Sequence, residues 1–146
     1  HLDAALRSLE ALAAAAEKRS VSLGIENRYH LHEVPDVEEL AIIFKEFSGS
    51  RAGFWFDIGH ATAKQNLGIE EPRALLERFG NSLVGVHLHG CRGYRDHEAP
   101  GTGDEEYTHL KKFLRPETLR VVETHHRAGP KELRRGLQFL RQQGVD

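Results

Sequence analysis

VSLGIE, at residues 21–26, is an apolar run that ends in a carboxylate, and three further runs have the same form. They are AGFWFD (52–57), LVGVH (83–87) and RVVE (120–123). Short runs of this composition are typical of strands that are buried in a parallel sheet. Their last residues are 31, 30 and 36 positions apart (26 to 57, 57 to 87, 87 to 123), and a strand, helix and return connection has about that length. The four runs therefore predict one repeated β/α unit.

The last residues of these runs form a set that we call the strand-end cluster: Glu26, Asp57, His87 and Glu123. Parallel strands point the same way, so side chains just past their carboxyl ends are expected to converge. Three carboxylates and one imidazole make a mixed oxygen and nitrogen ligand set for a divalent cation. We expect metal binding here. For any single carboxylate, a helix N-cap or a loop salt bridge is the alternative.

Length and composition limit the class of protein. The chain has 146 residues, of which 39% are hydrophobic and 29% charged, which predicts one globular domain over residues 1–146. A net charge of −2 argues against a broad cationic surface for nucleic acid or an anionic membrane. The single cysteine, Cys91, excludes an intrachain disulfide and fits a cytoplasmic location. No apolar stretch approaches the roughly 20 residues of a membrane span.

The connecting segments read mostly as helices. Residues 2–19 are rich in Ala, Leu, Glu and Arg and open the chain with a helix that no strand precedes, so we expect an upstream part of the fold to be missing. Further helices are expected at residues 37–47, 58–68, 70–80, 105–113 and 130–143. Residues 90–104 hold four glycines and one proline, which predicts a long functional loop.

Five short motifs carry a resemblance to a known family. They are GIEN (24–27), FDIGH (56–60), GVHLHG (85–90), RDHEAPGTG (95–103) and VVETHH (121–126). In this order they resemble the xylose isomerase-like TIM barrels, a group that holds sugar isomerases, sugar epimerases and endonuclease IV. The resemblance covers nearly the whole chain but only half of such a barrel. It implies an α/β fold, the C-terminal half of a (β/α)8 TIM barrel, with four parallel strands and helices on the outer face.

The resemblance also implies roles for particular residues. It assigns the metal to the strand-end cluster and places His60, Arg95 and His97 near the substrate. His89 alternates with His87 along the strand, so we expect their side chains to point to opposite faces and one of them to be structural. The resemblance assigns the metal to His87.

Arg95 favours one branch of the family over another. Endonuclease IV-like members carry a metal-binding Asp two residues before the histidine that corresponds to His97, and here that position is Arg95. A guanidinium cannot ligate a metal, but its planar fork suits a hydroxyl, carboxylate or phosphate of a small substrate. We therefore expect a divalent-metal-dependent sugar, or sugar phosphate, isomerase or epimerase.

Such a reaction removes a proton next to a carbonyl and stabilises the negative charge that develops. Glu26 and Glu123 lie on the first and last strands, so they could act on opposite faces of the substrate as base and acid. Asp57 and His87 would then be ligands only. The ligand set fits manganese or magnesium best, with zinc or cobalt as alternatives.

Two other classes stay open. One is a metal-dependent phosphoesterase that acts on abasic DNA, and the other is a truncated half-barrel without catalytic activity. A half-barrel exposes two strand edges and an apolar inner face, so we expect either self-association or a missing N-terminal half.

Overall fold

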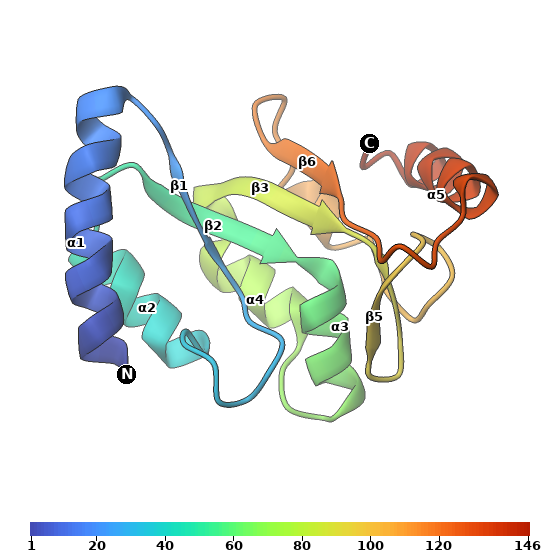
Figure 1. Cartoon of the computed structure of the whole chain (residues 1–146), viewed down its shortest axis with the longest axis horizontal. Coiled ribbons are helices and arrows are strands. Elements are labelled where there is room, and N and C mark those ends of the chain that lie inside the picture. Colours follow the sequence, from blue (N-terminus) through green and yellow to red (C-terminus); the bar gives the residue numbers. More distant parts are fainter.

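The computed structural model describes all 146 residues and contains one four-stranded parallel sheet (Figure 1). The strand order is β1-β2-β3-β6. The strands are β1 (Leu23–Glu26), β2 (Ala52–Asp57), β3 (Leu83–Leu88) and β6 (Leu119–Val122). Each neighbouring pair is parallel, so all four carboxyl ends lie at the same edge. The four expected strands and their common direction are confirmed.

Five α-helices accompany the sheet, and Figure 1 shows α1 and α5 at its opposite ends. They are α1 (Leu2–Arg19), α2 (Val37–Glu46), α3 (Ile58–Asn66), α4 (Pro72–Phe79) and α5 (Pro130–Gln143). Helix α2 begins at a capping box, in which the Asp36 carboxylate accepts the Glu39 N–H and the Glu39 carboxylate accepts the Asp36 N–H. None of the helices is both long and apolar enough to cross a membrane.

Helices cover one face of the sheet, and the other face is partly exposed. Phe54, Phe56 and Val86 are buried on the outer face, in one cluster with apolar side chains of α2, α4 and α5. On the inner face Leu119 and Val121 keep 61% and 41% of their surface exposed. The chain is therefore an open α/β half-barrel with helices on one side, as expected from the resemblance.

Trp55 fills the centre of the inner face, between two glycines of the flanking strands. A Cβ at Gly24 would lie 2.8 Å from the Trp55 ring, and a Cβ at Gly85 would overlap it. The ring edge also contacts the His87 imidazole, with 5.0 Å between the ring centroids. Glycines on both sides thus make room for the indole, which supports the histidine at the strand end.

Gly85→Ala should lower the free energy of unfolding by about 1–3 kcal/mol, because the added methyl forces the indole off its site. Urea denaturation measures the change. Gly129→Ala is the matched control, since a Cβ there would meet nothing closer than 3.6 Å. Equal free energies of unfolding for the two variants would show that the Trp55 ring shifts to accommodate the methyl group without loss of stability.

Two expectations for the segment after β3 were wrong. Residues 90–98 form an antiparallel hairpin of β4 (Gly90–Arg92) and β5 (Arg95–Glu98) in place of a loop. Residues 105–113 do not form an α-helix and contain only the short 3-10 turn η2 (Leu110–Lys112), while η1 (Gly80–Ser82) precedes β3. The Glu105 carboxylate accepts the N–H groups of Cys91 and Gly101, so contacts with the hairpin override helix propensity in this segment.

Candidate metal centre

His87 lies at the middle of the strand-end cluster. Its Nδ1 is 2.8 Å from Glu26 Oε1, 3.2 Å from Asp57 Oδ2 and 3.0 Å from Glu123 Oε2. Asp57 and His87 are paired in register on β2 and β3, while Glu26 ends β1 and Glu123 directly follows β6. One imidazole nitrogen therefore faces carboxylates from three other strands.

The donor set fits a divalent cation. The four candidate ligand atoms all lie within 4.8 Å of one another. Metal–ligand bonds of about 2.0–2.6 Å place ligands on opposite sides of an ion about 4–5 Å apart, so only small shifts would be needed. Three carboxylates around one point also concentrate negative charge, which a dication would neutralise.

Asp57 is fully buried, and its two oxygens serve different partners. Oδ1 accepts the His60 N–H at 2.8 Å and so caps α3, while Oδ2 faces His87. The His89 Nε2 lies 2.9 and 3.1 Å from the two oxygens. Burial raises the pKa of this carboxyl, but the hydrogen bonds from His87 and His89 outweigh it and hold the pKa far below its usual range. Asp57 is thus an anion that the fold keeps charged.

Asn27 fixes the position of Asp57 from the neighbouring strand. Its side-chain amide donates to the Asp57 carbonyl oxygen at 2.9 Å and accepts the Asp57 N–H at 2.8 Å. The His60 Nδ1 is 3.0 Å from the Asn27 carbonyl oxygen. Asn27 is 1% exposed and was not among the expected site residues, although it is the last residue of the GIEN motif.

The two glutamates of the cluster have different surroundings. Arg28 binds Glu26 Oε2 at 2.8 Å, which leaves Oε1 directed at His87. Glu123 contacts only the histidines His87 and His97, and its side chain is 44% exposed compared with 21% for Glu26. Glu123 is therefore the carboxylate with the greatest freedom and the best access from outside.

The His87 proton competes with a metal for the same position. Burial lowers the pKa of His87, but hydrogen bonds to Asp57 and Glu26 and the charge of Glu123 outweigh it and raise the pKa to about 10. At pH 8 the imidazole is thus protonated in the metal-free protein. A cation at Nδ1 must displace that proton.

Metal binding at pH 8 should therefore release about one proton, and the affinity should rise with pH toward 10. Isothermal titration in two buffers of different ionisation enthalpy gives the number of protons released. His109→Gln is a control, because His109 lies outside the cluster and should leave the release unchanged. Binding without proton release would exclude His87 as a ligand.

A second group of histidines lies beside the cluster. His60, His89 and His97 also offer ligand atoms within 4.8 Å of one another. In His89, however, Nδ1 accepts the His97 N–H at 2.8 Å while Nε2 is directed at Asp57. Both of its nitrogens are thus engaged. The Asp96 carboxylate lies 3.7 Å from His60 Nε2 and 3.1 Å from His97 Nδ1, at the outer side of this group.

The expectation that His87 and His89 point to opposite faces was wrong. Both histidines contact Asp57, because residues two apart along a strand share a face. His89 is fully buried and stacks on the His97 ring, with 4.3 Å between centroids, so it positions other groups. Asp96 was also missed, although its place directly before His97 in the RDHEAPGTG motif was a usable signal.

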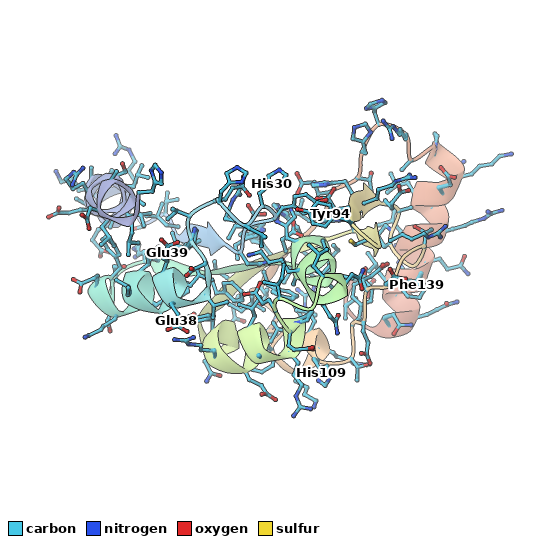
Figure 2. All side chains as sticks on the ribbon, turned by 90° about the horizontal axis from the view of Figure 1, so that it is seen from below. His30, Glu38, Glu39, Tyr94, His109 and Phe139 are labelled. Atoms are coloured by element: carbon cyan, nitrogen blue, oxygen red, sulfur yellow. The ribbon has the colours of Figure 1, made fainter.

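The proposed substrate residues lie in two places. His60 and His97 border the strand-end cluster, with His97 Nε2 3.6 Å from Glu123. Arg95 lies farther out on the hairpin, where its side chain is 71% exposed and pairs with Glu98. The Tyr29 and Tyr94 rings lie 4.5 Å apart and tie the loop after β1 to this hairpin, and Figure 2 shows His30 and Tyr94 on the same side of the molecule.

The repeated β/α units, with ligand groups at the strand ends, define this chain as an α/β protein of TIM-barrel type. More narrowly, the chain belongs to the xylose isomerase-like TIM barrel family, whose model matches residues 1–143. The family expectation is confirmed. No curated protein sequence matches the chain.

Two solved structures have similar folds. One is a D-tagatose 3-epimerase-like protein, with 22% sequence identity and a TM-score of 0.79. The match covers 97% of this chain and 54% of that protein's chain. The other is the 3-keto-D-glucoside 4-epimerase YcjR from E. coli, with 19% identity and a TM-score of 0.69, covering 97% of this chain and 55% of that one. The chain thus spans about half the length of these structures, in agreement with a partial barrel.

Proposed function

We propose that this chain carries the metal centre of a divalent-metal-dependent sugar or sugar phosphate isomerase or epimerase. The observation that carries the proposal is the strand-end cluster, in which two glutamates from the outer strands flank one buried aspartate and one histidine. The family and the two structurally similar proteins, whose names describe epimerases, support the same reaction class.

The surroundings of each ligand suggest how the work is divided. Asp57 is buried and hydrogen-bonded at both oxygens, which suits a residue that only holds the cation. Glu26 and Glu123 lie on opposite sides of the cluster, and each has one oxygen directed at His87. In this proposal one glutamate takes the proton from the carbon next to the carbonyl and keeps it, and the other donates a proton of its own from the opposite side. Exchange with water then restores both groups.

The bound cation would supply Lewis-acid polarisation of the substrate carbonyl, and manganese or magnesium fits the ligand set best, with zinc or cobalt as alternatives. Arg28 holds Glu26 Oε2 at 2.8 Å, so that Oε1 stays directed at His87. His60 and His97 border the cluster on one side, where they could hydrogen-bond substrate hydroxyl groups.

The direct test is metal binding followed by turnover. Manganese, magnesium, cobalt and zinc are titrated into the protein, and each loaded form is assayed with a panel of free and phosphorylated ketoses. Saturable metal binding that His87→Gln abolishes, together with turnover of one ketose, supports the proposal. Turnover that persists after chelation and in His87→Gln would refute it.

A second candidate function rests on the group of His60, His89 and His97 beside the cluster. Additional imidazoles could hold further zinc and so favour a phosphoesterase that acts on abasic DNA. Both nitrogens of His89 are engaged, however, and the net charge of −2 offers no broad cationic surface. Zinc-dependent nicking of an abasic duplex would favour this function over the isomerase.

The open sheet leads to an expectation about association. Leu119 and Val121 are exposed on the inner face, and the outer edges of β1 and β6 pair with no other strand. Such edges and apolar surface favour association, so the chain should self-associate or require an N-terminal half to cover them. Sedimentation velocity tests this expectation, and a monodisperse monomer at about 100 μM would contradict it.

A further inference from the structure

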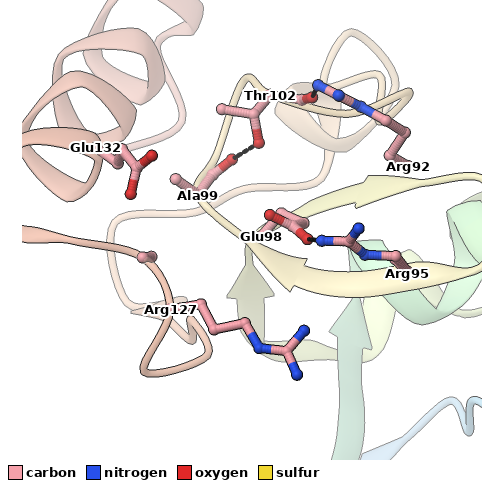
Figure 3. Close-up of a pocket in the computed structure, with 8 residues that line it drawn as sticks. Arg92, Arg95, Glu98, Ala99, Thr102, Arg127 and Glu132 are labelled. Carbon is pink, nitrogen blue, oxygen red and sulfur yellow. Dashed lines mark hydrogen bonds and ion pairs between the residues drawn. The ribbon is translucent and has the colours of Figure 1, made fainter.

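A pocket rich in arginine lies between the β4–β5 hairpin and the loop from β6 to α5 (Figure 3). It has a volume of about 300 Å³. The hairpin contributes Arg92 and Arg95, and the loop contributes Arg127. Three guanidinium groups around one small cavity would attract an anion, provided that nearby carboxylates do not already neutralise them.

Two carboxylates also line the pocket, and only one of them pairs with a pocket arginine. Glu98 pairs with Arg95, and this ion pair is exposed, so it is weak and an anionic ligand can replace Glu98. Glu132 accepts the N–H of Gly129 at 2.8 Å and so caps the start of α5. Three positive groups against two negative ones leave the pocket with one net positive charge.

Arg127 is the side chain that supplies this free charge. Arg92 donates to the Thr102 carbonyl oxygen, whereas Arg127 makes no hydrogen bond or ion pair with the protein. Figure 3 shows the Arg127 side chain extending from its loop toward the hairpin strand that carries Arg95. A guanidinium presents five N–H donors in a fixed fork, which matches the oxygens of a phosphate.

A second cavity lies between this pocket and the border of the metal centre and shares lining residues with the pocket. This second cavity of about 270 Å³ is lined by Arg95 and Arg127 and also by Asp96 and His97. His97 in turn lies 3.6 Å from Glu123 of the strand-end cluster. The His125 N–H donates to the His97 carbonyl oxygen at 2.7 Å, which holds the loop against the hairpin. A ligand with one end at the cluster could therefore extend along His97 to the arginines.

We propose that Arg127 and Arg95 bind the phosphate group of a sugar phosphate substrate. The proposal rests on the proposed function, and it narrows that function to phosphorylated sugars. A phosphate monoester carries a charge of about −1.5 to −2 at pH 7. This charge is larger than that of the single Glu98 carboxylate, so the phosphate replaces Glu98 as the partner of Arg95.

The test uses inorganic phosphate on the metal-free protein, so that neither metal nor turnover is required. Isothermal titration at constant ionic strength should show saturable binding, and Arg127→Gln should weaken it about tenfold or more, as for a lost charged hydrogen bond. Arg134→Gln is the matched control, because Arg134 is an exposed arginine on α5 that does not line the pocket. This control should bind phosphate like the unchanged protein.

Non-saturable binding, or equal weakening in Arg127→Gln and Arg134→Gln, would overturn the proposal. The assay with ketoses provides the second arm: the preference in kcat/KM for a phosphorylated ketose over its free form should fall about tenfold or more in Arg127→Gln. A preference that does not change would also overturn it. If phosphate binds through Arg127 but no ketose is turned over, the pocket is supported as a phosphate site and the isomerase function fails.

Discussion

Glu123→Gln should lower turnover by about 10² to 10⁴ at saturating metal, the usual range for a lost general acid or base. The substitution keeps the size of the side chain and one acceptor oxygen, so the remaining cluster can still form. Glu123 is the most exposed of the three carboxylates in the cluster and contacts only histidines, which leaves it free to exchange a proton with a substrate. Turnover is measured against metal concentration on the ketose panel.

Glu106→Gln is the matched control, because Glu106 is exposed and lies outside the cluster. It should retain full turnover. A residue that only holds the metal can be rescued by more metal, whereas a residue that also moves a proton cannot. Full recovery of Glu123→Gln at high metal concentration would therefore show that Glu123 is a ligand alone.

Asp57→Asn should have a different and mainly structural effect. The carboxylate is fully buried among His60, His87 and His89, and removing one partner of such an ionic group costs about 3–5 kcal/mol. The folded-state pKa of Asp57 lies below its ordinary value of 3.8, so its stabilising contribution is present above that pH and is lost as the pH falls further. The variant should therefore unfold at lower urea concentration near pH 7 and lose less stability on acidification.

Urea denaturation at about pH 7 and about pH 3, on either side of the ordinary pKa, measures both effects, with Asp3→Asn as an exposed control that should change neither. Where the Asp57→Asn variant remains folded, its weakened metal binding should recover as metal is added, unlike the turnover of Glu123→Gln. A stability within about 0.5 kcal/mol of the unchanged protein would show that Asp57 is not the buried anion described above.

The sequence predicted the parallel sheet and the convergence at its edge because both depend on local patterns. An apolar run predicts a buried strand, and in a parallel sheet the last residue of every such strand lies at the carboxyl edge of the sheet. Four runs at nearly equal spacing were enough to place the strand-end cluster within one site. The roles of its members remain predictions.

The segment after β3 could not be predicted in the same way. Its fold depends on Glu105, whose carboxylate accepts the N–H of Cys91 in the hairpin, 14 residues away, and that of Gly101 beyond the hairpin, 4 residues away. No local pattern shows the contact with Cys91. The positions of Asp96 and His89 depend on the same hairpin. Propensity alone favoured a helix at residues 105–113, and tertiary hydrogen bonds overrode it.

The Asp57 carboxylate joins the cluster to the backbone of α3, since Oδ1 caps the helix at the His60 N–H and Oδ2 faces His87. An ion held at Oδ2 restricts the same carboxylate that stabilises the first turn. Local opening of that turn then requires release of the ion, so its free energy rises with occupancy. Amide hydrogen exchange of the α3 first turn should consequently slow as metal is added, while α1, which contributes no ligand, keeps its own rate. The exchange rate of the α3 first turn thus reports metal occupancy of the strand-end cluster, and this measurement requires no substrate.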